Sequence, residues 1–155
     1  MVRRWCDIAP IFLGDDLFAC QPIAAAIQKA GGNFILTCKP SSHQIITEYL
    51  TGAELSEHRQ TVVTRGKRTT MIYRWLSAVP PRATEDALTV NWFSAEILNA
   101  KGKRTCYNSF VTDLPVTAAT VTELAACGRA LEDRERNVQR FKDRRLQPRT
   151  QLRAR

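Results

Sequence analysis

The sequence lacks several features that would define its class at once. Its apolar stretches are far shorter than the roughly 20 residues that a membrane-spanning helix needs, so we expect no transmembrane segment. No signal-peptide pattern opens the chain, its five cysteines include no C-x-x-C pair, and it has only two histidines. These absences argue against a disulfide framework and a zinc site, and we expect a cytoplasmic protein with free thiols.

Acidic residues are scarce relative to basic ones, and the imbalance is concentrated near the C-terminus. The formal net charge is +8, and residues 129–155 contribute +6 of it, with ten Arg and Lys against four Asp and Glu. A basic chain normally suggests a nucleic-acid partner. Here the basicity belongs mainly to the tail. The whole chain, with 155 residues and 44% apolar content, is long enough for one modest domain.

The first fifty residues alternate between strand-like and helix-like segments. Residues 9–13 and 34–38 are short apolar runs typical of buried strands. A helical pattern follows each run, at 22–30 and at 45–50, and residues 41–44 (SSHQ) resemble a capping box before the second helix. Such alternation favours a parallel-type α/β sheet.

The middle of the chain changes to the period of β-strands. Residues 60–64 and 69–75 flank the turn RGKR, and residues 88–98 and 105–112 flank NAKGKR. We therefore predict two antiparallel hairpins with basic, glycine-containing turns.

The last part of the chain begins with a helical pattern and then loses its period. Residues 117–127 have apolar side chains at helical spacing. From Leu131 onward apolar residues are few, and we expect either a solvated helix or disorder there.

Two adjacent aspartates follow the first predicted strand, in the stretch FLGDDLFACQP. Asp15 and Asp16 either lie in a polar turn, where one of them caps the next segment, or hold Mg²⁺ or Mn²⁺. The second alternative is chemically reasonable because hard cations prefer oxygen ligands and strand ends are rigid supports. Adjacent residues at a strand end point in different directions, so we expect only one of the two to face a site.

Further clusters are candidates for contact with DNA phosphates. Lys39, Ser41, Ser42 and His43 follow the second predicted strand and offer an amine and hydroxyl donors; the alternative is a capped helix start. The basic turns, with Arg65, Lys67 and Arg68 in the first and residues 101–104 in the second, either contact a DNA backbone or are simply solvated.

The order of these features resembles the catalytic domain of bacterial insertion-sequence DDE transposases. The stretches LGDDLFACQPI, GGNFILTCKPSSH and NSFVTDLPV carry the resemblance, which runs from about Ile11 to Arg129. It implies a partial RNase H-like α/β domain over residues 11–128, with an antiparallel β insertion at about 55–112.

The resemblance also implies a site and a chemistry. In this family three acidic residues hold two divalent metals that activate a nucleophile for attack on a DNA phosphodiester. The second acid follows a pattern like A-D-x-x-Y/F, which Asp15 and Phe18 fit, so Asp15 is the expected ligand and Asp16 the alternative. The expected cofactor of the intact family is Mg²⁺ or Mn²⁺, and the expected partner is DNA.

The third acid of the family should lie on the helix after FVTDLP, in a pattern like RW-x-I-E-x-x-F-x-x-L-K, but the chain differs there. When the residues from Leu131 onward are encoded with permitted codons and read one nucleotide later, they give WKIENETFNVLKTAGYNLEHNFGHG, which resembles the missing segment. We therefore interpret 129–155 as an irregular or helical, basic tail read out of frame. The shifted glutamate codon straddles Arg134 and Glu135, and Glu135 would point away from the metals, because one residue is about 100° of helix rotation.

The first acid should lie on a strand well upstream of Asp15. Residues 1–10 provide no such strand, and they are either an internal start or another junction. We therefore predict a truncated, frame-disrupted transposase fragment that does not bind the metals tightly and is inactive. The alternatives are a small basic DNA-binding or regulatory protein, which acts through its tail or forms an oligomer with an intact transposase, and a product with no stable fold.

Overall fold

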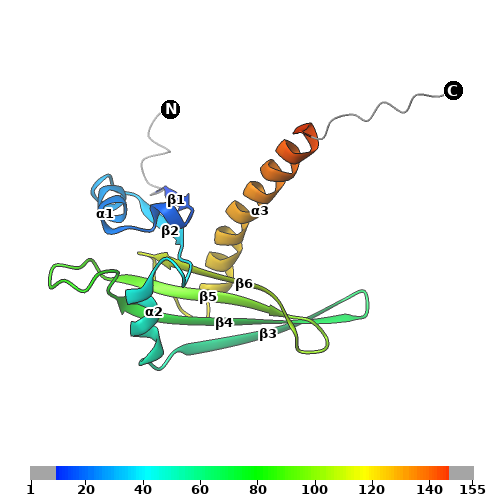
Figure 1. Ribbon diagram of the computed structural model, residues 1–155. Coiled ribbons are helices and arrows are strands. Elements are labelled where there is room, and N and C mark those ends of the chain that lie inside the picture. Colours follow the sequence, from blue (N-terminus) through cyan, green and yellow to red (C-terminus); the bar gives the residue numbers. More distant parts are fainter. Residues whose placement is uncertain (1–9, 147–155) are drawn as a thin grey trace, which may run out of the picture.

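The computed structural model describes the backbone of residues 10–146 and the side chains of residues 10–134 and 136. In this part of the chain it contains one six-stranded mixed sheet and three α-helices (Figure 1). The elements in chain order are β1 (Ile11–Gly14), the 3₁₀ turn η1 (Asp16–Phe18), α1 (Gln21–Lys29), β2 (Asn33–Thr37), α2 (Gln44–Thr51), β3 (Ser56–Thr64), β4 (Lys67–Val79), β5 (Val90–Leu98), β6 (Arg104–Thr112) and α3 (Val121–Leu146).

The sheet has the strand order β1-β2-β6-β5-β4-β3. β1 and β2 are parallel and are connected through α1, as the alternation of strands and helices predicts. β6 then pairs with β2 in the antiparallel direction, through Leu36 opposite Val111, and the two predicted hairpins follow outward from it. The prediction of parallel strands therefore holds only for β1 and β2. The two hairpins extend the same sheet with antiparallel strands.

The capping-box prediction for α2 is wrong. The helix begins at Gln44 with His43 as its N-cap, and no side chain makes the capping hydrogen bond. With Ser41 as the N-cap, Gln44 would be the third helical residue, whereas it is the first. The neighbouring Ser42 hydrogen-bonds to the carboxylate of Asp16, a residue far back in the sequence.

Both faces of the sheet are covered by helices. On one face the buried residues Phe34, Leu36 and Trp92 pack with α1 and with Ile46 of α2. On the other face the N-terminal part of α3 packs over a second cluster, whose members include Ile35, Tyr73, Phe93, Ala95, Phe110, Val116, Val121, Leu124 and Ala125. The rings of Phe93 and Phe110 stack there with centroids 5.1 Å apart.

Helix α3 continues to Leu146, so the helix and not disorder is the correct alternative for the backbone of residues 131–146. Residues 1–9, which include most of the N-terminal segment of uncertain origin, and residues 147–155 of the tail lie outside the described residues. None of the helices in the described part is long and apolar enough to cross a membrane.

Candidate functional site

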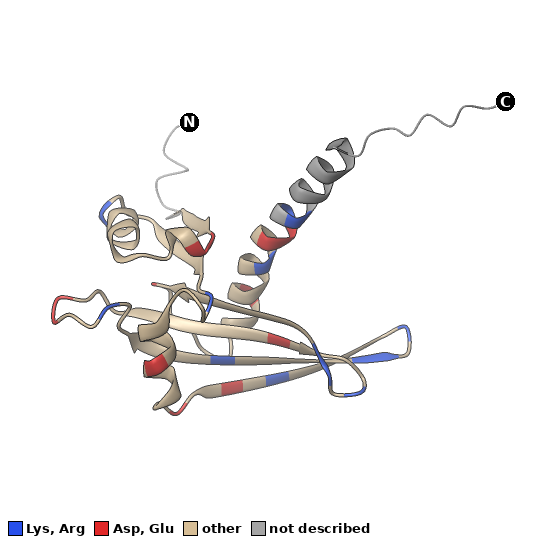
Figure 2. Cartoon of the chain, in the orientation of Figure 1, with Lys and Arg blue, Asp and Glu red and all other residues tan. Residues whose placement is uncertain are grey.

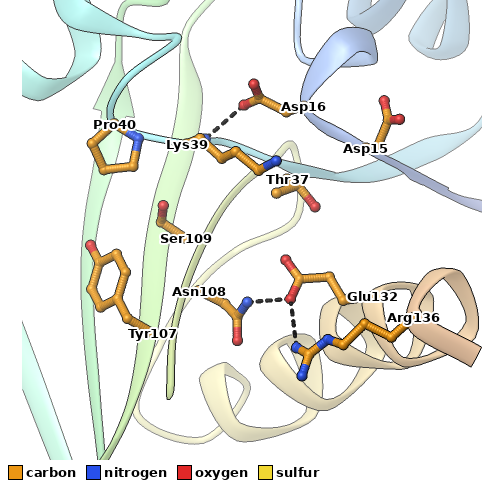
Figure 3. A pocket seen from close by; sticks show the side chains of 10 residues that line it. All are labelled: Asp15, Asp16, Thr37, Lys39, Pro40, Tyr107, Asn108, Ser109, Glu132 and Arg136. Carbon is orange, nitrogen blue, oxygen red and sulfur yellow. Dashed lines mark hydrogen bonds and ion pairs between the residues drawn. The ribbon is translucent and has the colours of Figure 1, made fainter. Parts of the chain in front are cut away.

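A pocket of about 320 Å³ lies where the parallel pair of strands ends, beside α3 (Figure 3). Its lining residues come from the ends of β1 and β2, from β6 and from α3: Asp15, Asp16, Thr37, Lys39, Pro40, Tyr107, Asn108, Ser109, Glu132 and Arg136. The unequal lengths of the strands create it. The pairing of β2 with β6 ends at Thr37 opposite Phe110, whereas β6 extends back to Arg104.

Asp15 acts as a cap at the end of β1. Its backbone is extended, and its Oδ1 accepts a hydrogen bond from the backbone N–H of Leu17 at 3.0 Å. This contact begins the turn η1, as the polar-turn alternative predicts. The carboxylate that the transposase resemblance selects as the metal ligand is therefore engaged by its own backbone.

Asp16 has the wider set of partners. Its Oδ1 accepts from the backbone N–H of Lys39 at 2.7 Å and lies 3.1 Å from Nε2 of His43. Burial alone would raise the pKa of the Asp16 carboxyl, but the hydrogen bonds from Ser42 and Lys39 and the interaction with His43 hold that pKa below its usual value. Asp16 thus joins the end of β1 to the loop between β2 and α2, while Asp15 points to its own turn (Figure 3).

The sequence reasoning missed Glu132, the third carboxylate of the pocket. Its Oε2 accepts hydrogen bonds from Nδ2 of Asn108 on β6 and from the guanidinium of Arg136, the latter at 3.4 Å. A signal for it existed in the helical stripe of Val121, Ala125 and Gly128, because Glu132 lies one further turn along the same face. Glu132 is the last residue of this stripe. Because few apolar residues follow it, the sequence does not show that the same helix continues past this position.

The charges that surround the pocket largely balance. Asp15, Asp16 and Glu132 bring three carboxylates, and Lys39 and Arg136 bring two cations. Within the described residues, no group of three or more His, Cys, Asp or Glu side chains is placed to hold a metal ion. Mg²⁺ takes near-octahedral oxygen ligands at about 2.0–2.1 Å, so a cation here would have to displace hydrogen-bond donors that Asp15, Asp16 and Glu132 already have.

The neighbouring thiol adds no nucleophile. Burial and, to a smaller extent, the nearby Asp16 carboxylate raise the pKa of the Cys38 thiol to about 12. A reactive cysteine needs a lowered thiol pKa, so Cys38 is a buried structural residue.

The structure divides the predicted phosphate-binding residues into separate groups. Lys39 lines the pocket, Ser42 and His43 contact Asp16, and Ser41 lines a neighbouring hollow with Gln44. Arg65 lies in the β3–β4 turn and Lys67 and Arg68 begin β4, and none of these three cations lines the pocket (Figure 2). The side chain of Glu135, which the frame hypothesis directs away from the metals, lies outside the described residues.

A comparison of the chain with protein-family models found no match, and a comparison with curated proteins found none either.

Proposed function

We propose that the chain is a fragment of a DDE-type transposase with an RNase H-like fold and that it does not cleave DNA. The pairing of the pocket carboxylates carries the proposal. Asp15 caps a turn, Asp16 holds the β2–α2 loop, and Glu132 is bound to Asn108 and Arg136. A divalent cation would have to replace these partners before the carboxylates could ligate it.

One edge of the described sheet agrees with an RNase H-like domain that has a further strand. Among the described strands β1 lies at this edge, and its three consecutive apolar residues Ile11, Phe12 and Leu13 are exposed within the described part of the chain. Native edge strands are usually protected by charge, proline, a bulge or a covering segment. An additional strand bearing the first acid would find both a pairing edge and an apolar surface here.

The arrangement around Asp15 and Asp16 also agrees with this lineage. The aspartates follow the carboxyl end of a strand in a β-α-β unit, and a helix after the last strand brings a glutamate to the same pocket. In the intact family this chemistry would use Mg²⁺ or Mn²⁺ on a DNA substrate. In this fragment Lys39 and Arg136 supply the positive charge at the pocket instead.

The test is an assay of purified full-length chain for nicking and strand transfer on DNA with Mn²⁺. We expect no cleavage, and we expect Mn²⁺ to leave the thermal unfolding midpoint unchanged. Asp15→Ala and Asp16→Ala serve as controls for a contaminating nuclease, whose activity neither substitution would alter. Cleavage that disappears in either variant would contradict the proposal, and so would a Mn²⁺-dependent rise in the midpoint that Asp16→Ala removes.

The nucleotide sequence around Ala130 tests the origin of the tail separately. If the bases from Leu131 onward, read one nucleotide later, do not encode the string that begins WKIENETF, the tail is not an out-of-frame transposase segment. That result would leave the pocket geometry unaffected.

The second candidate function is a basic DNA-binding or regulatory protein that acts through its tail, alone or with an intact transposase. Arg136 favours it, because its side chain is 60% exposed on α3 at the start of the arginine-rich segment. Salt-sensitive DNA binding that is lost when residues 134–155 are deleted would support this function. Unchanged binding after the deletion would exclude the tail as the contact.

A further inference from the structure

One end of the sheet is strongly basic. Six exposed cations gather in the two hairpin turns at this end and in the first residues of the strands that follow them: Arg65, Lys67, Arg68, Lys101, Lys103 and Arg104. Thr70 pairs with Leu98, so the start of β4 and the end of β5 are neighbours and the two turns emerge on the same side (Figure 2). Among the described residues, the ion pair at this end joins Arg104 to Glu96 at 3.8 Å, and the turns themselves contain no acid.

The β3–β4 hairpin extends beyond the rest of the sheet. Beyond the pair Thr70 and Leu98, residues 67–69 of β4 pair only with residues 62–64 of β3. Residues 62–69, here termed the basic ribbon, therefore form a free two-stranded segment that projects by about 10 Å, at roughly 3.3 Å per residue. Its outer surface includes Val63, whose exposed fraction is 64%.

The turn of the basic ribbon has an unusual residue at its tip. Arg65 has φ +51° and Gly66 has φ +75°, so both central residues are left-handed, as in a type I′ turn. Asn, Asp or Gly is favoured at the first of these positions, and an arginine there is conformationally unfavourable. The strained turn places a guanidinium at the most protruding point of the hairpin, and such outliers often mark functional positions.

We propose that the basic ribbon enters the major groove of duplex DNA, while the β5–β6 turn contacts the adjoining phosphate backbone. The major groove of B-DNA is about 12 Å wide and admits a two-stranded β-ribbon. The major groove of A-form RNA is too narrow and deep for one, which favours DNA as the partner. Lys101 and Lys103 lie one to two strands further along the sheet, about 5–10 Å away at the usual strand spacing, and so face the flanking phosphates. This binding requires neither the pocket nor a metal.

Salt-dependent binding by the full-length chain tests the surface. Affinity for a short DNA duplex would be measured in EDTA at several salt concentrations for Lys67→Gln/Arg68→Gln and for Lys101→Gln/Lys103→Gln. The matched control is Lys29→Gln/Arg82→Gln, which removes the same charge from exposed positions of α1 and the β4–β5 loop. Since each phosphate contact contributes about 0.9 to the slope of log affinity against log salt, we expect each turn variant to reduce that slope by about 2. The control should keep the slope. Turn variants that behave like the control would overturn the proposal.

Arg65→Asn separates a contact from a structural role. Asparagine suits the left-handed position, so this variant should raise the thermal unfolding midpoint, while it weakens DNA binding because the tip charge is lost. Unchanged DNA affinity would show that Arg65 does not contact the DNA. An RNA duplex of the same sequence that binds as tightly as the DNA would refute insertion into the major groove. The binding assay contains no divalent metal, so cleavage in the nicking assay would contradict the proposed loss of activity without affecting this result.

Discussion

The two adjacent aspartates should differ in their contribution to stability. Asp16 accepts the backbone N–H of Lys39 at 2.7 Å and lies 3.1 Å from His43, with 13% of its side chain exposed. Hydrogen bonds to a charged group contribute about 1.5–3 kcal/mol each, and the removal of Asp16 also leaves the N–H of Lys39 without this partner. The contact with His43 is only partly buried, so water screens it and we count it as a small addition. We therefore expect Asp16→Ala to lower the free energy of unfolding by about 2–3 kcal/mol.

Asp15→Ala is the matched comparison. It removes one capping contact to Leu17 in an exposed turn, where water can replace the lost acceptor. Caps of this kind contribute about 0.5–2 kcal/mol, so we expect a loss of about 1 kcal/mol. Urea unfolding can be followed through the fluorescence of the buried Trp92. A loss for Asp15→Ala that equals or exceeds the loss for Asp16→Ala would refute the assignment of the loop contact to Asp16.

The pH dependence of the effect gives an independent check. The pKa of Asp16 in the folded chain lies below the ordinary value of 3.8, because the hydrogen bonds and His43 outweigh the effect of burial. A lowered folded-state pKa stabilises the protein fully above the unfolded-state value, and the effect is lost as the pH falls through the folded-state value. The stability difference between the native chain and Asp16→Asn should therefore be constant near neutral pH and shrink below about pH 3.8. A difference that disappears already near pH 6 would contradict the role of this carboxylate.

Two substitutions test the backbone and the core in opposite directions. Gly128→Ala should destabilise the protein, because the added Cβ would lie 2.6–2.9 Å from ring atoms of Phe110. This clash should outweigh the helix propensity of alanine, which exceeds that of glycine by about 1 kcal/mol. A raised thermal unfolding midpoint would show that the ring can move aside. Ala78→Gly should stabilise the protein by about 0.5–1 kcal/mol, since Ala78 has φ +57° at the irregular pairing between β4 and β5, and a lower urea midpoint would contradict this.

The local pattern of the sequence predicts most of the helices and strands because side-chain period and turn residues are local properties. The hairpin turn at RGKR, the helix around Pro22 and the strand before Asp15 all lie within two residues of where the pattern places them. The start of α2 could not be predicted in the same way. The helix begins after His43 and not after the predicted cap Ser41, while Ser42 and His43 contact Asp16. Those contacts depend on how closely β1 and the β2–α2 loop approach each other.

The pocket shows the same division more strongly. The sequence alone places two carboxylates at a strand end, but it does not show that Asp15 is engaged by its own turn and Asp16 by Lys39. Glu132 was missed because its partner, Asn108, lies on a strand 24 residues earlier. Only the packing of α3 over β6 brings these two side chains together.

The sequence by itself determined the order of the elements, the aspartate pair at a strand end, and the concentration of positive charge in two turns and the tail. These follow from periodicity and composition, which each short segment carries independently of the others. The tertiary structure decided which carboxylates meet in the pocket, which partners neutralise them, and that the two basic turns emerge together from one end of the sheet. Those outcomes depend on strand register and helix packing, which are fixed when distant segments bury their apolar faces against one another.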